Sequence, residues 1–263
     1  MKRIKHAFIS ILCIPLLMTG CWNAGENQES TTGAESFLLS EFEEDWYGDS
    51  AKEKLVLYSQ EKEGRPIYWT IRLNEDEVAK LGPEDGAFSV ASMKLEDLDG
   101  DQKPEVLFYR YSTGTAGAQD LNVFQVTEKK LTNIFSVANL FENMEENYQM
   151  EYIGNYQVSF VNYKTGLKAT IPVYRETHYP EEEELLQRIS AWVDPIFQYD
   201  FPDSNKDGVK EIVTRQRVIG VSHPDTIGFQ KTTFILVDGQ YKASEQALYD
   251  SRENLLAKIS LID

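Results

Sequence analysis

Two acidic segments of nine residues, spaced 106 residues apart, constrain this chain more than any other feature. The first, DLDGDQKPE, covers residues 97–105, and the second, DSNKDGVKE, covers residues 203–211. Both have oxygen-bearing side chains at positions 1, 3, 5 and 9, and both lead directly into an apolar segment of strand character. Ionised carboxylates this close together repel one another, so either the segments are solvated surface turns or a cation neutralises them.

The groups that would hold such a cation are the four side chains and the backbone carbonyl at position 7. In the first segment they are Asp97, Asp99, Asp101, Glu105 and the carbonyl of Lys103; in the second, Asp203, Asn205, Asp207, Glu211 and the carbonyl of Val209. Alternate residues of a tightly curved loop point inward, and with water the ligands reach about six or seven oxygens, the number that calcium prefers. Zinc would require His or Cys, which both segments lack. The sequence therefore predicts two structural calcium sites.

The two segments resemble the calcium loops of FG-GAP and VCBS-type repeats, which are known from integrin α-chain propellers and many bacterial surface proteins. The resemblance covers the loops and their flanking strands, and it implies a β-rich repeat with the calcium loop between strands. Two departures stand in the first segment: Gly100 occupies position 4, and Gln102 stands where the family usually has glycine. Both segments close with Glu where Asp is commoner, and a closed propeller has more copies than two.

The order of elements around the two segments indicates an internal duplication of about 105 residues. Each half begins with a predicted β-hairpin (54–60 with 67–74, and 156–162 with 167–174), and each continues with a predicted helix (75–81 and 180–192). Strands are predicted on both sides of each acidic segment. They cover 87–95, 106–111 and 121–126 in the first half, and 194–201, 212–218 and 232–238 in the second. A closing helix is predicted at 244–262. We expect a mainly β fold with short helices, of the α+β class. Its two tandem repeats, 37–146 and 147–263, would form a propeller-like or packed-sheet arrangement.

The N-terminus has the features of a secretory signal. Three basic residues precede an apolar run at 7–18 that is too short to span a bilayer, and the run ends in MTGC at residues 18–21. This ending resembles the lipobox of bacterial lipoproteins, in which the signal (here 1–20) is removed and the next residue, Cys21, carries diacylglycerol and a further acyl chain such as palmitate. Residues 21–36 would then form a flexible tether. Ordinary secretion with a spare thiol at Cys21 is the alternative.

Cysteine content and charge limit the environment and the partners. Cys21 would be the only cysteine of the processed chain, so no internal disulfide can stabilise it. Removing residues 1–20 takes away three positive charges and lowers the formal charge from −17 to −20. A field of this sign excludes general binding to nucleic acid. The chain is expected at the outer face of the bacterial cytoplasmic membrane, attached through its lipid anchor.

No recognisable catalytic motif occurs in the chain. A protein or cell-wall partner of unknown identity is therefore expected, with a binding or scaffolding role. One rival is a cell-envelope hydrolase that uses residues near the loops 112–119 and 220–228. The segment SHPD (222–225) offers Ser, His and Asp, but adjacent residues rarely converge in a catalytic relay, and His223 is expected to be a polar loop or packing residue. Another rival is a transporter solute-binding subunit. The aromatic residues Tyr68, Trp69, Phe108 and Tyr109 are expected in the core rather than on a sugar-binding platform.

Overall fold

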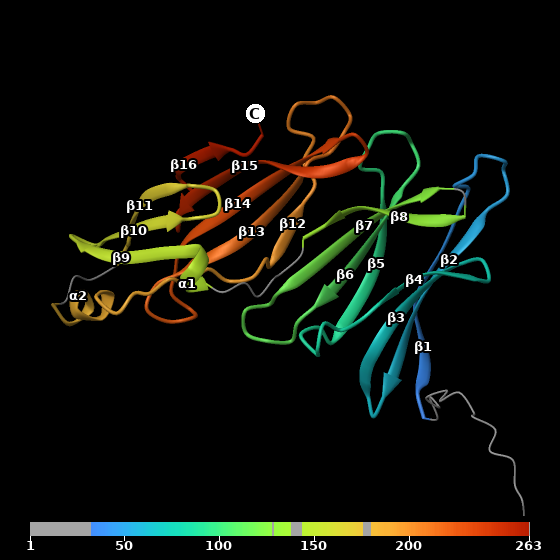
Figure 1. Ribbon diagram of the computed structural model, residues 1–263, viewed down its shortest axis with the longest axis horizontal. Coiled ribbons are helices and arrows are strands. Elements are labelled where there is room, and N and C mark those ends of the chain that lie inside the picture. The colour runs from blue at the N-terminus through green and yellow to red at the C-terminus, as the bar shows by residue number, and fades with distance from the viewer. Residues whose placement is uncertain (1–32, 128, 138–143, 176–179, 263) are drawn as a thin grey trace, which may run out of the picture. The chain divides into compact units, whose positions relative to one another are not determined.

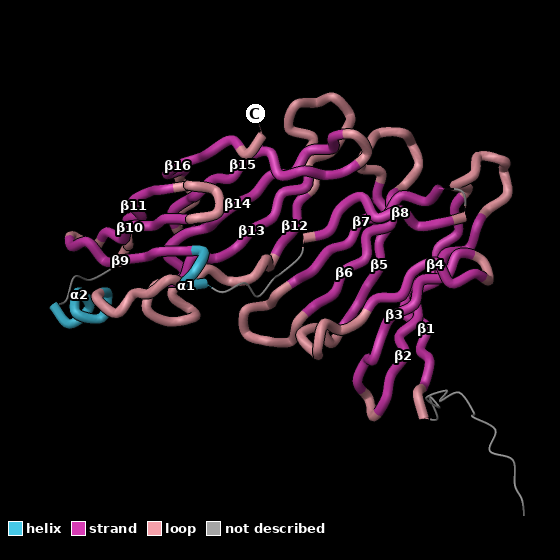
Figure 2. The backbone as a smooth tube through the Cα atoms, viewed as in Figure 1, coloured by secondary structure: helices cyan, strands magenta, loops and turns pink. Residues whose placement is uncertain are grey.

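The computed structural model describes residues 33–127, 129–137, 144–175 and 180–262 of the 263-residue chain. These residues belong to one compact unit that begins at Gly33. Strands account for 58% and helices for 3% of the structure, so the prediction of a mainly β fold is confirmed. In the described part of the chain, helix is confined to two short segments (Figure 2), α1 (Met144–Asn147) and α2 (Pro180–Leu186).

The first half of the described chain forms two four-stranded antiparallel sheets (Figure 1). In the first sheet the strands follow the order β1-β2-β3-β4, and in the second the order is β5-β6-β7-β8. The strands of the first sheet are β1 (Glu35–Glu44), β2 (Glu53–Lys62), β3 (Arg65–Leu73) and β4 (Asp76–Leu81). Those of the second sheet are β5 (Val90–Glu96), β6 (Glu105–Tyr111), β7 (Gln119–Thr127) and β8 (Lys130–Ser136).

The second half forms a three-stranded and a five-stranded antiparallel sheet, in the orders β11-β10-β9 and β12-β13-β14-β15-β16. The smaller sheet consists of β9 (Tyr148–Gly154), β10 (Gln157–Asn162) and β11 (Lys168–Pro172). The larger consists of β12 (Gln198–Asp200), β13 (Ile212–Ile219), β14 (Thr226–Val237), β15 (Gln240–Asp250) and β16 (Leu255–Ser260). The described sheets are open, and consecutive strands pair as neighbours within each one.

Two clusters of buried apolar side chains hold these sheets together. The first cluster joins the two four-stranded sheets to β12, β13 and β15, and the second joins the three-stranded sheet and α2 to the five-stranded sheet. Trp69 and Phe108 are fully buried in the first cluster and meet edge to face, with ring centroids 6.2 Å apart. Tyr109 is buried there too, which confirms the core assignment of these three aromatic residues. Tyr68 is half-buried instead, with the Lys80 ammonium 3.6 Å from its ring centroid.

Both predicted hairpins are confirmed as β2–β3 and β10–β11, but two of the three predicted helices are wrong. Residues 76–81 form β4, because Asn74 adopts a φ of 55° and closes a tight turn back from β3. Residues 244–262 belong mostly to β15 and β16, which pair antiparallel. The helix predicted at 180–192 ends at Leu186, where turn-type bonds from the N–H groups of Arg188 and Ile189 follow.

Several features of the N-terminus lie outside the described residues. These are the predicted signal at 1–20, Cys21 and the tether up to residue 32, whereas residues 35 and 36 of the predicted tether belong to β1. Within the described segments, no helix has the length and apolar character required to cross a bilayer.

Candidate functional site

The two acidic segments form loops between antiparallel strands, as predicted. The first acidic loop (97–105) connects β5 to β6 and ends with Glu105, the first residue of β6, which pairs with Glu96. The second acidic loop (203–211) connects β12 to β13 and ends with Glu211, immediately before Ile212. The closing glutamates are both buried, so each loop starts near the solvent and ends at the base of a strand.

The backbones of the two loops turn at the same positions. Position 4 has a positive φ in both loops, 78° at Gly100 and 63° at Lys206. Position 6 has one as well, 69° at Gln102 and 89° at Gly208. Two left-handed residues separated by one residue curl the chain tightly, so that several amide and carboxylate groups of a loop face its centre.

The side chains of the first loop fold back onto its own backbone. The side chain at position 1 accepts a hydrogen bond from the N–H of position 6, and the side chain at position 3 accepts one from position 5. The side chain at position 5 accepts one from position 7, and the closing glutamate at position 9 accepts one from position 2. The bonds run to Asp97 from Gln102 (3.1 Å), to Asp99 from Asp101 (3.1 Å), to Asp101 from Lys103 (2.7 Å) and to Glu105 from Leu98 (2.8 Å). A second bond to Asp97, from the N–H of Gly100, is 2.8 Å long.

The second loop repeats this set of bonds at positions 106 residues later. They run to Asp203 from Gly208 (3.2 Å), to Asn205 from Asp207 (3.0 Å), to Asp207 from Val209 (2.8 Å) and to Glu211 from Ser204 (2.9 Å). The one difference concerns the second bond to position 1, which comes from the N–H of Asp207, at position 5, rather than from position 4. Two loops of different sequence therefore have one hydrogen-bond scheme.

The first loop gathers its carboxylates more closely than the second. One oxygen from each of Asp97, Asp99 and Glu105 lies within 4.8 Å of the others, a separation that a single cation could bridge. Asp101 is not part of this group. Among the described residues, the carboxylates of the second loop form no group of three at this separation. There the amide of Asn205 donates instead to the carboxylate of Asp207, over 2.8 Å.

Lys103 and Val209, the residues predicted to offer a carbonyl, sit at position 7 of their loops. Each donates its N–H to the aspartate at position 5. The ammonium of Lys103 extends out of the first loop and donates to the carbonyl of Trp46, over 2.7 Å. The positive charge in that loop therefore contacts the segment that connects β1 to β2.

Burial and mutual repulsion raise the pKa values of two carboxylates of the first loop, Glu105 and Asp99. The pKa of Glu105 rises to about 7, mainly because the side chain is 1% exposed, with the charges of Asp99 and Asp101 adding to the effect of burial. The hydrogen bond from Leu98 opposes this rise. Burial also raises the pKa of Asp99, and the neighbouring Asp101 and Asp97 raise it further. A cation at this point would reverse the repulsive contribution to both shifts.

The two loops lie against each other, which the sequence did not predict. A Cβ atom added to Gly100 would stand 2.6 Å from the carbonyl oxygen of Gly208. The N–H of Lys210 donates to the carbonyl of Leu98 over 2.7 Å, and the hydroxyl of Tyr241 donates to the carbonyl of Lys210 over 3.0 Å. The glycine at position 4, a departure from the repeat pattern, was the one sequence signal of this contact.

The buried Tyr241 responds to the charges of both loops. Burial raises the pKa of its phenol, and the carboxylates of Glu105, Asp99 and Glu211 raise it further. Carboxylates of both loops raise the pKa of the same phenol because both loops lie close to Tyr241. Any cation bound to one loop would therefore be close to the other.

The loops 112–119 and 220–228 do not assemble the relay that SHPD offers. The imidazole Nε2 of His223 lies 3.3 Å from the carboxylate of the buried Asp194, and its ring centroid is 5.7 Å from that of Trp192. Asp225 instead forms a two-point ion pair with Arg175, at 2.9 and 2.8 Å. These contacts agree with the packing role expected for His223. The other histidine outside the predicted signal, His178, lies outside the described residues.

Comparisons with known proteins give a family likeness without a known activity. A family model described as the YybI C-terminal domain matches residues 146–249. The chain is also similar to the uncharacterized protein YybI of Bacillus subtilis (strain 168), with 23% identity over 196 residues, which cover 70% of this chain and 74% of that protein. No solved structure matches the chain. The chain thus resembles YybI, and the segment matched by the family model contains the second acidic loop.

Proposed function

We propose that this chain is a lipid-anchored bacterial protein whose folded part is stabilised by calcium in two acidic loops. The observation that carries the proposal is the shared geometry of the loops, which have the same left-handed positions and the same side-chain to backbone bonds. The converging oxygens of Asp97, Asp99 and Glu105 support a cation in the first loop. Oxygen ligands without His or Cys favour calcium over zinc.

The same geometry supports an internal duplication. In both halves a hairpin (β2–β3 or β10–β11) precedes a strand, an acidic loop and a run of antiparallel strands (β6–β7–β8 or β13–β14–β15). Conserved loop geometry with little sequence identity is typical of duplicated units. Because the described sheets are open, we favour a packed-sheet arrangement of the two repeats over a propeller.

The anchor follows from the N-terminal sequence alone. The basic residues, the short apolar run and MTGC before residue 22 support lipid attachment at Cys21, on the outer face of the cytoplasmic membrane. Two or more acyl chains hold a protein stably on a bilayer, whereas one does so only marginally. Replacing Cys21 with Ala should release the protein from the membrane fraction and abolish labelling by radioactive palmitate, and labelling that persists would contradict the anchor.

We propose a binding or scaffolding role for the folded part. Loops and strands on a rigid antiparallel framework commonly carry recognition surfaces. We place the hydrolase alternative second, because Asp225 of SHPD pairs with Arg175 and so does not join Ser222 and His223 in a relay. The transporter alternative calls for two α/β lobes, whereas the pairings among the described strands are antiparallel.

Thermal unfolding with and without calcium tests the calcium part of the proposal. At millimolar calcium and a dissociation constant of about 10⁻⁴ M, each site adds about 1.4 kcal/mol. Two sites should therefore raise the Tm by about 5–10 °C. The double variant Asp97→Asn/Asp203→Asn should lose this shift, whereas Asp238→Asn, at an exposed turn, should keep it. A wild-type Tm that is the same in calcium and in chelator would show that the loops are plain acidic turns.

A further inference from the structure

Strand β1 is an edge strand whose N-terminal part, Glu35–Leu39, is exposed on both faces, whereas Phe42 near its end packs against the first core cluster. It pairs with β2 and with no other described strand, so one of its two edges presents unpaired backbone N–H and C=O groups. None of its ten residues is buried, whereas Glu53, Leu55–Leu57 and Ser59 of the neighbouring β2 are buried. The exposed edge is therefore available to another extended chain.

The apolar segment Phe37–Leu39 of β1 lacks the charged side chains that usually protect an edge. Phe37, Leu38 and Leu39 are 43%, 55% and 42% exposed, and they form a continuous apolar segment. Natural edge strands are commonly protected by lysine or proline, but β1 contains neither. A bulge at Leu39 interrupts the register with β2, so that the N-terminal part of the strand, Glu35–Leu38, forms a separate paired segment.

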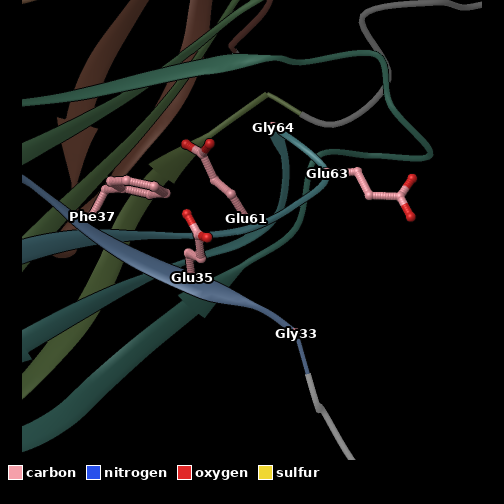
Figure 3. Close-up of a pocket in the computed structure, with 6 residues that line it drawn as sticks. All are labelled: Gly33, Glu35, Phe37, Glu61, Glu63 and Gly64. Atoms are coloured by element: carbon pink, nitrogen blue, oxygen red, sulfur yellow. The ribbon is translucent and has the colours of Figure 1, made fainter.

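A pocket of about 120 Å³ opens beside this segment. Its lining includes Phe37, Glu35, Glu61 and Glu63 (Figure 3). Glu35 and Glu61 are register partners on β1 and β2, and Figure 3 shows both carboxylates on the side of Phe37, whereas Glu63 extends away from it. An aromatic ring beside carboxylates suits the aliphatic stem and cationic head of a lysine or arginine.

The negative charge of β1 favours a positively charged partner. β1 carries four glutamates and no basic residue, and one of the four, Glu41, is paired with Lys54 at 2.9 Å. A second copy of this chain paired antiparallel along the full length of the same edge would place Glu35 opposite Glu44, with no basic residue of β1 to offset the negative charges of both strands. An anionic lipid surface would be repelled for the same reason. A cationic extended segment avoids both penalties.

We propose that the outer edge of β1 binds an extended, cationic and amphipathic segment of a partner protein by strand addition. Backbone hydrogen bonds to Glu35–Leu38 would hold the segment, and a lysine or arginine would enter the pocket beside Phe37. This inference rests on the binding role proposed above and on none of its calcium chemistry. Peptide binding and the calcium-dependent Tm can therefore fail separately.

A labelled peptide of ten residues that alternates lysine with valine and threonine provides the probe. Its binding is followed by fluorescence anisotropy with the chain from residue 22 onward, which contains the whole compact unit that begins at Gly33. The peptide should bind at least about tenfold more tightly than the same peptide with glutamate in place of lysine. Phe37→Lys should weaken binding by about tenfold or more, since it places a positive charge in the pocket. If Phe37→Lys does not fold, Glu35→Lys replaces it as the test variant, with the same expected loss of binding.

Two controls separate strand addition from general attraction. Ile153→Lys changes a residue that is 50% exposed on the edge strand β9, and it should leave the affinity within about twofold of the wild type. A peptide that keeps its lysines but is N-methylated at alternate residues cannot pair along β1, and it should bind at least about tenfold more weakly. Equal binding of the methylated peptide, equal binding by Phe37→Lys, or no binding of any peptide would overturn the proposal.

The other possible occupants give distinct results. A concentration-dependent dimer in sedimentation that Phe37→Lys dissociates would assign the edge to a second copy. Binding of the wild type, but not of Phe37→Lys, to phosphatidylglycerol vesicles would assign it to the membrane. Either result would overturn the proposal of a cationic peptide partner.

Discussion

Gly100 lies against the backbone of Gly208, so close that a Cβ atom on residue 100 would stand 2.6 Å from the carbonyl oxygen of residue 208. The contact joins the two acidic loops, which are far apart in sequence. It requires a residue without a side chain at position 100, and the φ of 78° there makes the same demand.

Replacing Gly100 with Ala should therefore destabilise the fold by about 2 kcal/mol or more, since the change adds a clash to an unfavourable backbone angle. Urea unfolding monitored by tryptophan fluorescence measures this difference. Gly82→Ala is the matched control, because a Cβ there meets nothing within 4 Å. Equal stability of the two variants would show that the loops do not need their close contact.

The pKa of Glu105 predicts how stability depends on pH in the absence of calcium. The folded-state pKa of about 7 exceeds the ordinary value of the unfolded chain, so the folded state holds the proton more tightly. The resulting stabilisation is fully present below pH ~4.3 and is lost as the pH rises through 7, by at most about 4 kcal/mol. Denaturant unfolding at pH 5 and pH 8 in chelator should show this loss.

Two comparisons check that prediction. Glu105→Gln should remove most of the pH dependence, because the amide does not titrate. Calcium should stabilise the protein more at pH 8 than at pH 5, because the proton and the cation compete for the same carboxylate. A chelator-treated protein that becomes more stable between pH 5 and pH 8 would contradict the assignment of this dependence to Glu105.

A buried ion pair links β6 to β7. The guanidinium of Arg110 donates twice to the carboxylate of Asp120, at 2.7 and 2.5 Å, and both residues are buried. Asp120→Ala should destabilise the protein by about 3–5 kcal/mol, because it leaves the arginine without its buried partner. Glu84→Ala removes the exposed partner of the same arginine and should change stability by less than about 1 kcal/mol. Equal losses in the two variants would contradict this ranking.

A network of buried amides joins the three-stranded and five-stranded sheets. The amide of Asn162 on β10 donates to Gln230 on β14 (3.2 Å) and to Gln246 on β15 (3.0 Å). Asn162→Ala should cost about 2–3 kcal/mol, because two buried carbonyl oxygens lose a donor. In the Asn162→Ala variant, amide hydrogen exchange should show faster opening in β10 and β15 than in β2, which lies outside this network. Unchanged exchange in β10 would contradict the role of this residue.

The strands of this fold were more predictable than its helices. Residues 74–82 contain a helix start signal and a stop signal, yet Asn74 uses its polar side chain to accept a hydrogen bond from the N–H of Lys54. Residues 244–262 were predicted to form a closing helix because the buried positions of β15 include the polar side chains Gln246 and Asp250. These polar residues hide the alternation that would have indicated a strand.

The candidate site was predictable within each loop and not between them. The positions of the oxygen-bearing side chains followed from local spacing, and in the structure these side chains make the same set of backbone hydrogen bonds in both loops. The contact of Gly100 with Gly208, and the position of Tyr241 beside both loops, depend on how separate sheets pack. Strand β1 was also unforeseen, because its first residues read as the end of a polar tether.

Counting bound calcium tests the central claim most directly. Isothermal titration of the chain from residue 22 onward should give two calcium ions per molecule, with dissociation constants of about 10⁻⁴ to 10⁻³ M. Asp97→Ala and Asp203→Ala should each remove one ion, and Asp238→Asn should remove none. Titration of the wild type without heat, or binding that both loop variants leave intact, would contradict the claim that the acidic loops hold calcium.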